Sequence, residues 1–351
     1  MTILLFSDND RSALACNLLA DQLRTRGQPC LTAGLSQNQE KESPLPFLQP
    51  QVCLSLDALL ASNLREQVSA LGLFLSEPKE LKVFIESHRN LSALRGHPAA
   101  PVFSGPLQAS LGDQLMQELH DNLGCDLLLL PGVRQQQSVN AVIQHWPSDI
   151  RRPRLLTAGL WFMPERPPRG YLSGGHATHP HRLVALVQDT APTATGGRSR
   201  LLLQLIHWAE ASPDWSVVIQ RDDSWERGST WVPRFQPSEW SLPDNLAFAA
   251  PGQLLSHLAN CSACITVSSP WAMTAMAWGK KTILVGDYGI HTNEGTTSWF
   301  GCGSLHRLHS IRQLDQLLDL PDSNQLWLES MGWGIHDGVD RLIKTLEELK
   351  A

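Results

Sequence analysis

Short apolar runs alternate with segments of helix length along this sequence, and this alternation constrains the fold more than any other feature. In the first half the apolar runs are Thr2–Phe6, Leu71–Leu75, Ala100–Gly105 and Cys125–Gly132. Helical patterns fall between them at 78–94, 110–123 and 134–145. Strands separated by helix-length segments indicate βαβ units, whose strands pair in a parallel sheet. We therefore predict an α/β fold.

A stretch rich in proline and glycine, Met163–Arg182, interrupts the alternation. It holds four prolines and three glycines in twenty residues, a composition typical of a linker. Apolar runs then resume at 183–189, 215–220 and 245–249, with helical patterns at 197–211 and 252–259. We predict two Rossmann-like domains facing across a cleft, at 1–165 and 183–335, with a linker at 166–182. A last helix at 336–351 can cross back to the first domain.

The composition and charge of the chain exclude several functional classes. A length of 351 residues suits two hydrophobic cores, and 42% hydrophobic with 18% charged residues is an ordinary globular balance. The formal net charge of -6 argues against a nucleic-acid partner, because nucleic acids select basic surfaces. The sequence has no run of eighteen apolar residues and no basic leader after Met1. We therefore predict no membrane span, no signal peptide and a cytoplasmic location.

Seven cysteines are scattered along the chain without a visible disulfide framework, which suits a reducing compartment. Two of them, Cys261 and Cys264, form a lone C-x-x-C. A thioredoxin-like pair opens a helix, whereas this pair leads into an apolar strand candidate. We interpret both as buried or half-buried thiols.

Two serines and a proline, Ser268-Ser269-Pro270, stand where an apolar strand turns into a short helix. Pro270 suits the first helical position, because its missing N–H would be unpaired there anyway. A helix N-terminus at the carboxyl end of a parallel strand attracts phosphate, and hydroxyls there add donors. Capping alone needs only one serine. We predict an anion site at Ser268 and Ser269, with a simple serine cap as the alternative.

The residues around and beyond this helix carry a family resemblance. They are Val267-Ser268-Ser269, Ala277-Trp278-Gly279, Gly286-Asp287-Tyr288-Gly289 and Gly301-Cys302-Gly303. The pattern resembles the C-terminal domain of GT-B glycosyltransferases, which holds the phosphate of the donor nucleotide. More narrowly, it resembles an uncharacterised bacterial family of GT-B-type glycosyltransferases. The similarity extends to "GRSRLLLQLIHWAEASPDWSVVIQR", to "PVFSGPLQAS" with "LGCDLLLL", and to "FSDND", so it covers most of the chain.

The resemblance implies transfer of a sugar from a nucleotide-sugar donor to a glycan or lipid-linked acceptor, as in polysaccharide biosynthesis. It implies no metal and no cofactor besides the nucleotide-sugar substrate, because a helix dipole and hydroxyls can stabilise the leaving phosphate. One departure bears on the donor. Thr274 stands where the family has a glutamate, often a ribose ligand, and Trp271 and Trp278 are bulky where the family tends to be small. The donor, the acceptor, the oligomeric state and contact with a membrane surface stay open.

Asp8 and Asp10 are the candidates for a catalytic base. They flank Asn9 directly after the first predicted strand. In GT-B-type sialyltransferase-like enzymes an acidic loop near the start of the chain supplies the base, and the resemblance implies that role here. A carboxylate at this place would take the proton of the acceptor hydroxyl as the new bond forms. The alternative is that Asp8 or Asp10 only caps the following helix.

Two charged residues at predicted strand ends of the second domain are candidates for donor binding. Arg221 can clamp a phosphate bidentately, or it can pair with Asp222 or Asp223. Asp189 ends the first strand of that domain, at the sheet edge that carries ligands. It can contact the donor sugar, or it can pair with Arg198 or Arg200.

Three further candidates for donor binding follow the last predicted strand. Asp287 and Tyr288 belong to the motif that resembles the family, and Tyr288 can stack on a sugar or a base. Glu294 lies where GT-B loops reach the donor sugar, with a solvated loop acid as the alternative.

Gly105 and Pro106 are the candidates on the acceptor side. They end a predicted strand, and glycine lets a backbone approach a ligand closely. A plain turn is the alternative. The linker also holds His176, His179 and His181, but a Gly/Pro-rich hinge rarely supplies the fixed geometry that metal ligands need. We predict no metal site.

Two alternatives to a glycosyltransferase stay open. A nucleotide-sugar 2-epimerase shares the architecture, but it would need an array of catalytic acids and a histidine that the sequence does not single out. A GT-B-fold binding or scaffold protein that has lost its chemistry would bind nucleotide weakly or not at all, and the Thr274 departure favours it.

Overall fold

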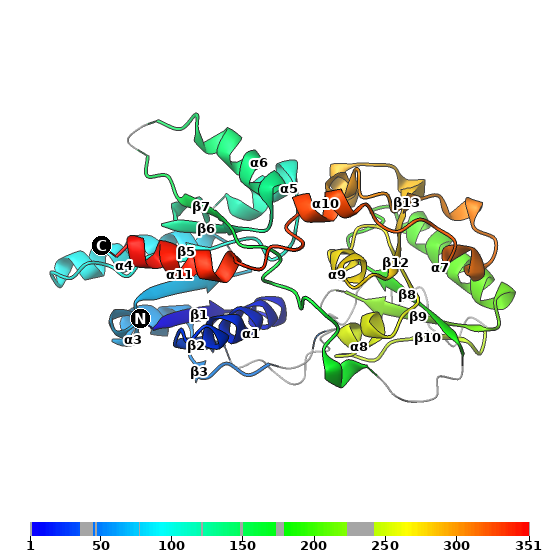
Figure 1. Cartoon of the computed structure of the whole chain (residues 1–351), viewed down its shortest axis with the longest axis horizontal. Coiled ribbons are helices and arrows are strands. Elements are labelled where there is room, and N and C mark those ends of the chain that lie inside the picture. The colour runs from blue at the N-terminus through cyan, green and yellow to red at the C-terminus, as the bar shows by residue number, and fades with distance from the viewer. Residues whose placement is uncertain are drawn as a thin grey trace. The chain divides into compact units, whose positions relative to one another are not determined.

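The computed structural model describes residues 2–35, 45, 48–76, 78–120, 122–147, 150–172, 179–222 and 242–350. The chain divides into two compact units, each with its own sheet (Figure 1). The first unit comprises Met1–Asn38, Phe47–Met163 and Glu329–Ala351. The second comprises Gln39–Pro46 and Pro164–Leu328.

The first unit holds a seven-stranded sheet in the order β3-β2-β1-β4-β5-β6-β7, with every pair parallel. The strands are β1 (Ile3–Ser7), β2 (Cys30–Gly34), β3 (Val52–Cys53), β4 (Ala70–Phe74), β5 (Val102–Ser104), β6 (Leu127–Leu130) and β7 (Arg154–Thr157). The helices are α1 (Asp10–Thr25), α2 (Leu56–Ala61), α3 (Leu64–Gln67), α4 (Pro78–Leu94), α5 (Gly112–Leu119), α6 (Val133–Ile143) and α11 (Gly338–Glu348). Strands β1, β4 and β6 are buried along their whole length, as expected for a parallel sheet covered on both faces.

The second unit holds a six-stranded sheet in the order β10-β9-β8-β11-β12-β13, again with parallel pairs. The strands are β8 (His181–Val187), β9 (Trp215–Arg221), β10 (Leu246–Phe248), β11 (Ala263–Thr266), β12 (Lys281–Val285) and β13 (Leu305–His306). The helices are α7 (Thr195–Ala211), α8 (Leu254–Ala259) and α9 (Trp271–Ala277), and α10 (Gln325–Ser330) spans the boundary between the units in the chain. Its core packs α7 against the central strands, with Trp208 and Trp215 fully buried.

The predicted fold class, α/β with two Rossmann-like domains, is confirmed by the two parallel sheets. The sequence patterns did not reveal β2, β3, β7 and β13. Strands β3 and β13 have two residues each, too few for a pattern, whereas β2 and β7 carry threonine, glycine or arginine among their apolar residues. The helix predicted at 110–123 is wrong in extent, because α5 ends at Leu119 and a separate 3-10 turn covers Asn122–Gly124.

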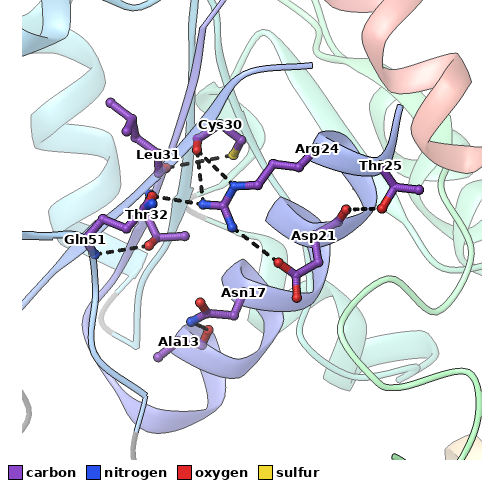
Figure 2. A network of polar contacts seen from close by, with 9 residues as sticks. All are labelled: Ala13, Asn17, Asp21, Arg24, Thr25, Cys30, Leu31, Thr32 and Gln51. Carbon is purple, nitrogen blue, oxygen red and sulfur yellow. Dashed lines mark hydrogen bonds and ion pairs between the residues drawn. The ribbon is translucent and has the colours of Figure 1, made fainter. Parts of the chain in front are cut away.

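Arg24, near the end of α1, ties that helix to the strands that follow it (Figure 2). Its Nε and Nη2 donate to the carbonyl of Cys30 on β2 at 3.3 and 3.1 Å, and Nη2 also donates to Gln51 Oε1 at 2.9 Å. Asp21 pairs with its Nη1 at 3.2 Å. Gln51 in turn accepts from the backbone N–H of Thr32 at 3.1 Å. These contacts fix the chain just before β3, an edge strand of only two residues.

The last helix of the chain, α11, packs within the first unit, where it contacts α1 and β7 (Figure 1). Asp340 pairs with Arg26 at 2.7 Å, and Glu348 pairs with Arg154 at 2.9 Å. The helix begins at Gly338, whose α-carbon has no room for a side chain because an added Cβ would lie 2.1 Å from the carbonyl oxygen of Ala158. The helix is therefore built into the first unit by both charge and close packing.

Both cysteines of the C-x-x-C are buried free thiols. Burial raises the pKa of Cys261 to about 12 and raises that of Cys264 as well. Neither therefore forms a thiolate near neutral pH, which agrees with the interpretation of structural thiols. In the part of the chain that the structure describes, no helix combines the length and apolar character needed to span a bilayer.

Candidate functional site

The candidate site of the second unit lies at the carboxyl edge of its sheet. Strands β9, β8, β11 and β12 are neighbours in that sheet, so their carboxyl ends lie side by side. Arg221 ends β9, Asp189 follows β8, Ser268 follows β11, and a 3-10 turn, Gly286–Tyr288, follows β12. Parallel α/β sheets bind ligands at this edge. The topology thus gathers residues that are far apart in the sequence.

The two serines after β11 have different surroundings. Ser269 is fully buried, and its Oγ accepts a hydrogen bond from the backbone N–H of Trp271 at 3.2 Å. Ser268 is half-buried, and its Oγ donates to Gln188 Oε1 at 3.1 Å. Helix α9 begins at Trp271, one residue later than predicted, with Pro270 at the N-cap. Ser269 therefore supports the turn, and Ser268 is the hydroxyl near the surface.

Glu294 anchors the loop that follows β8. Its carboxylate is 8% exposed and accepts hydrogen bonds from the Thr193 backbone N–H at 3.0 and 3.2 Å and from Thr193 Oγ1 at 2.6 Å. The alternative of a solvated loop acid is therefore wrong. The pair joins the segment after β12 to the segment after β8, close to Ser268, since a Cβ at Gly295 would lie 3.1 Å from Ser268 Oγ.

Tyr288 makes a second link between the same two loops. Its hydroxyl donates to the carbonyl of Gly197 at 2.8 Å, and a Cβ on Gly197 would lie 3.1 Å from the tyrosine ring. Burial, helped by the nearby charge of Asp287, raises the pKa of Tyr288 to about 12. The phenol therefore remains a neutral donor over the whole physiological range.

Replacing Tyr288 with phenylalanine removes this hydrogen bond, and we expect a loss of about 1 kcal/mol in the free energy of unfolding at neutral pH. The pKa in the folded state lies above the ordinary value of about 10 for an unfolded chain. The contribution of the hydroxyl is therefore complete below pH 10 and is lost as the pH rises towards 12. Urea unfolding of both proteins across this range measures the difference, and a difference independent of pH would contradict the assignment.

Arg221 and Asp189 form an ion pair. The side chain of Arg221 is 4% exposed and that of Asp189 is 29% exposed. Asp223, an alternative partner of Arg221, lies outside the described residues. Arg198, an alternative partner of Asp189, donates from Nε to the carbonyl of Pro192 at 2.8 Å. The pair joins the end of β9 to the segment after β8. Its guanidinium is buried, and the carboxylate of Asp189 is nearer to solvent.

The carboxylate of Asp287 contacts the segment that follows β13. Its Oδ2 accepts from the backbone N–H of Leu308 at 2.7 Å, and Oδ1 lies 3.7 Å from His309 Nδ1. These contacts fix the connection between β13 and the 3-10 turn that follows it.

Helix α7 contributes a feature that the sequence analysis did not single out. Its N-terminus follows β8 and is capped by Ala194, whose side chain makes no hydrogen bond. The first turn contains Gly196 and Gly197, and no described atom lies within 4 Å of a Cβ built on Gly196. A seventeen-residue helix therefore presents an open N-terminus at the ligand edge, which favours an anion. The signal in the sequence was "TGG" directly after a strand and its loop.

The candidate bases of the first unit lie at the carboxyl end of β1. Asp8 accepts from the Ser76 backbone N–H at 2.7 Å and from Ser76 Oγ at 2.6 Å, and it also accepts from Asn9 and Ser12. The helix cap is Asn9, whose side chain accepts from the Ser12 N–H at 2.8 Å. The alternative of an Asp8 or Asp10 cap is therefore wrong.

Asp10 differs from Asp8 in how its carboxylate is used. It stands in the first turn of α1 and is half-buried. No hydrogen bond or ion pair joins its carboxylate to any residue that the structure describes. The two acids therefore differ, because Asp8 joins the ends of β1 and β4 and the carboxylate of Asp10 has no such structural role among the described residues.

Gly105 and Pro106 follow β5 and are both buried. A Cβ on Gly105 would lie 2.3 Å from the carbonyl oxygen of Leu129 on β6. The glycine is thus required by the neighbouring strand. The loop beyond Pro106 is held by Glu118 on α5, which accepts hydrogen bonds from Gln108 and, at 2.8 Å, from Ser110. Burial raises the pKa of Glu118, and nothing in the sequence pattern pointed to this anchor.

The histidines of the predicted linker are only partly described. His176 lies outside the described residues, His179 Nδ1 lies 3.0 Å from the carbonyl of Pro213, and His181 Nδ1 lies 3.4 Å from Ser262 Oγ. Over residues 2–350, leaving aside the gaps given above, no group of three or more His, Cys, Asp or Glu side chains is arranged to hold a metal ion.

Residues 81–349 match a family model described as "Putative glycosyltransferase (DUF6716)". The chain belongs to this family. The matched range includes every candidate residue of the second unit as well as Gly105 and Pro106, but it begins after Asp8 and Asp10. The resemblance inferred from the sequence is therefore confirmed, and the family relation covers the donor-side candidates more fully than the candidate bases.

Solved structures share the fold of this family member at low sequence identity. The UDP-GlcNAc 2-epimerase from Neisseria meningitidis, bound to UDP-GlcNAc, has a TM-score of 0.61 at 10% identity, over 99% of this chain and 100% of that chain. The UDP-GlcNAc 2-epimerase from Methanocaldococcus jannaschii, in complex with UDP-GlcNAc and UDP, has a TM-score of 0.61 at 11% identity, over 99% of this chain and 100% of that chain. The glycotransferase of kitacinnamycin has a TM-score of 0.51 at 13% identity, over 99% of this chain and 98% of that chain. Among curated proteins the search found no match.

Proposed function

We propose that the protein transfers a sugar from a nucleotide-sugar donor to a glycan or lipid-linked acceptor. The family match supports glycosyl transfer in general. Solved proteins with the same fold were captured with UDP or UDP-GlcNAc, which supports a nucleotide-sugar as the ligand class. The seven cysteines are free thiols, in keeping with the proposed cytoplasmic location. The proposal includes no metal and no cofactor besides the donor.

The observation that carries the proposal is the arrangement at the carboxyl edge of the second sheet. The open N-terminus of α7 follows β8, and Ser268 follows the adjacent strand β11. Glu294 and Tyr288 hold the loop after β8 and the start of α7 in place through Thr193 and Gly197. We propose that the donor phosphates bind at the N-terminus of α7 and to the hydroxyl of Ser268, where the helix dipole would stabilise the leaving phosphate.

The residues predicted for the donor take separate roles in this proposal. Ser268 contacts phosphate, and Ser269 shapes the turn. Glu294 and Tyr288 position the loops, and Asp287 fixes the connection to β13. Arg221 supplies a buried positive charge, and Asp189 is the acid nearer to the donor sugar. Thr274 is buried in α9 at 1% exposure, so we propose no ribose contact from that position.

Gly196 provides a direct test of the phosphate site. A Cβ at this position meets no described atom within 4 Å, so Gly196→Ala leaves the fold intact, and it can stabilise α7 slightly because alanine favours a helix. The added methyl would lie in the space that the phosphate needs. We expect the affinity for UDP, or for whichever of CMP, UDP and GDP binds, to fall about tenfold, or about 1.4 kcal/mol.

Gly170→Ala is the matched control for Gly196→Ala. Gly170 belongs to the same unit, and a Cβ there likewise meets no described atom within 4 Å. Isothermal titration calorimetry with each nucleotide measures both variants. If the two variants have equal affinities, or if Gly196→Ala binds nucleotide as tightly as wild type, the phosphate site is not at the N-terminus of α7.

We propose Asp10, with Asp8 as the second choice, as the base that accepts the proton of the acceptor hydroxyl. Asp10→Asn keeps the size of the side chain and loses its basicity, so we expect transfer to slow by about a hundredfold or more while nucleotide affinity stays unchanged. Asp57→Asn is the control, because Asp57 is exposed and stands in the first turn of α2 in the same unit. Initial rates with a nucleotide-sugar and an acceptor mixture test it. A rate for Asp10→Asn equal to that of the control would exclude Asp10.

An exchange experiment separates the transferase from its two rivals. A 2-epimerase removes the proton at C2 of the sugar, so incubation of the nucleotide-sugar in D2O without acceptor would place deuterium in the sugar. A transferase consumes donor only when an acceptor is present and leaves C2 unlabelled. Absence of both reactions, with weak nucleotide binding or none, would favour the silent scaffold. Mass spectrometry of the recovered nucleotide-sugar distinguishes the first two outcomes.

A further inference from the structure

A pocket of about 500 Å³ opens in the first unit, away from the edge that carries Asp8 and Gly105. Its wall includes Ser69, which directly precedes β4, and Pro101, which directly precedes β5. The pocket therefore lies at the amino-terminal edge of the sheet. Residues of α3, α4 and the chain end after α11 complete the wall.

A fully buried arginine forms part of this wall. The side chain of Arg65 is 0% exposed, and it makes three hydrogen bonds. Nε donates to the Leu60 carbonyl at 2.8 Å, Nη1 to Ser92 Oγ at 3.3 Å and Nη2 to Glu66 Oε1 at 3.0 Å. A guanidinium carries five N–H donors. Among the described residues these three bonds leave two donors of a buried cation unused, and buried polar groups normally find partners.

The charges around the pocket are mostly positive. Glu66 is the acidic residue among those that line it, and its carboxylate is shared between Arg65 and Arg95. Lys350 adds a further cation from the end of the chain, and His97 also lines the pocket. The carboxylate of Glu66 is thus paired with two arginines while Lys350 adds a cation to the lining, and this balance favours an anionic ligand.

Another titratable side chain of the wall is His88, whose environment favours the neutral imidazole. It is 1% exposed, its Nε2 lies 3.0 Å from the carbonyl of Ala100, and burial lowers its pKa. Its Nδ1 has no hydrogen-bond partner among the described residues. The wall therefore holds unused hydrogen-bonding capacity on two buried side chains, Arg65 and His88.

We propose that this pocket binds a small organic oxyanion, a phosphate or carboxylate compound, which takes the place of Glu66 on Arg65 and is neutralised by Lys350. In the empty pocket the carboxylate of Glu66 occupies the guanidinium, so it acts as an internal competitor. Its side chain is 31% exposed, and it can turn outwards to Arg95 when the ligand enters. A planar guanidinium pairs with either oxyanion through two parallel N–H bonds. The volume suits a compound of the size of a sugar phosphate.

The test is titration of the full-length chain with inorganic phosphate, ribose 5-phosphate and citrate, followed by calorimetry with UDP present throughout to fill the nucleotide site. We expect Lys350→Ala to weaken binding about fivefold and Glu66→Gln to strengthen it several-fold, because the competitor loses its charge. Lys344→Ala, which changes an exposed lysine on α11, is the control, and we expect it to leave the affinity unchanged. The phosphate and citrate arms show which oxyanion the pocket prefers.

Two outcomes would overturn the proposal. In the first, none of the three probes binds while UDP is present, and the pocket then holds only water. In the second, a probe binds but neither Lys350→Ala nor Glu66→Gln changes its affinity, so the probe binds outside this pocket. Both variants change side chains that are at least partly exposed, so the folded chain is retained, and thermal melting confirms this for each.

Discussion

Replacing Glu294 with alanine lowers the free energy of unfolding by about 2 kcal/mol and weakens nucleotide binding about tenfold. The carboxylate accepts hydrogen bonds from both the backbone N–H and the Oγ1 of Thr193. Hydrogen bonds to a charged acceptor are about twice as strong as neutral ones. Without them the loop after β8 loses its anchor beside Ser268 and the start of α7. Urea unfolding measures the first effect, and calorimetry with nucleotide measures the second.

Two further variants show whether this effect belongs to the anchor. Glu294→Gln keeps one acceptor oxygen, so we expect an intermediate loss of stability and of affinity. Glu210→Ala removes an exposed acid from α7 of the same unit, and we expect a change within about 0.5 kcal/mol. If Glu294→Ala behaves like Glu210→Ala in both measurements, the loop does not depend on the carboxylate, and Glu294 has no positioning role.

Replacing Gly105 with alanine lowers the free energy of unfolding by about 3 kcal/mol, because the new Cβ would lie 2.3 Å from the carbonyl oxygen of Leu129. A clash with backbone is costly to relieve, since β5 and β6 are central strands held on both sides. Chemical unfolding of the first unit, followed by circular dichroism, measures the loss. The sequence left open whether this glycine serves a ligand or a turn.

Gly124→Ala is the control for Gly105→Ala, because a Cβ on Gly124 has its nearest described neighbour, Ile85 Cδ1, at 4.0 Å. It belongs to the same unit, and we expect little change in stability. A Gly105→Ala protein as stable as wild type, but without transfer activity, would contradict the packing role and restore close approach to a ligand as the reason for the glycine.

The fold could be predicted from the sequence because its signals are local. Most of the long buried strands contain an apolar run, and the spacing between runs is the length of a helix. Strands β3 and β13 escaped prediction because each has only two residues. Strand β13 pairs with Leu284 and Val285 of β12. Two residues cannot show a period, so such a strand becomes visible only with its neighbour.

The candidate site could be predicted only as far as its residues follow strand ends. The corner at Ser268 and Ser269 was found from a strand, a proline and a helix. The division of roles between them was not, because it depends on Gln188, eighty residues away. The same holds for Glu294 and Thr193, which are 101 residues apart. At the end of β1, Asp8, Asn9 and Asp10 all cap helices well, and only the backbone geometry selects Asn9.

The segment that closes the first unit, Glu329–Ala351, is synthesised after the whole of the second unit. A ribosome therefore releases the strands of the first sheet long before α11 is available to cover β7. Helix α11 cannot cover β7 or the carbonyl of Ala158 during that interval, whereas all the residues of β8 to β13 have already been synthesised. During synthesis the second unit can thus reach its native state first, and the first unit, although it begins the chain, finishes folding last.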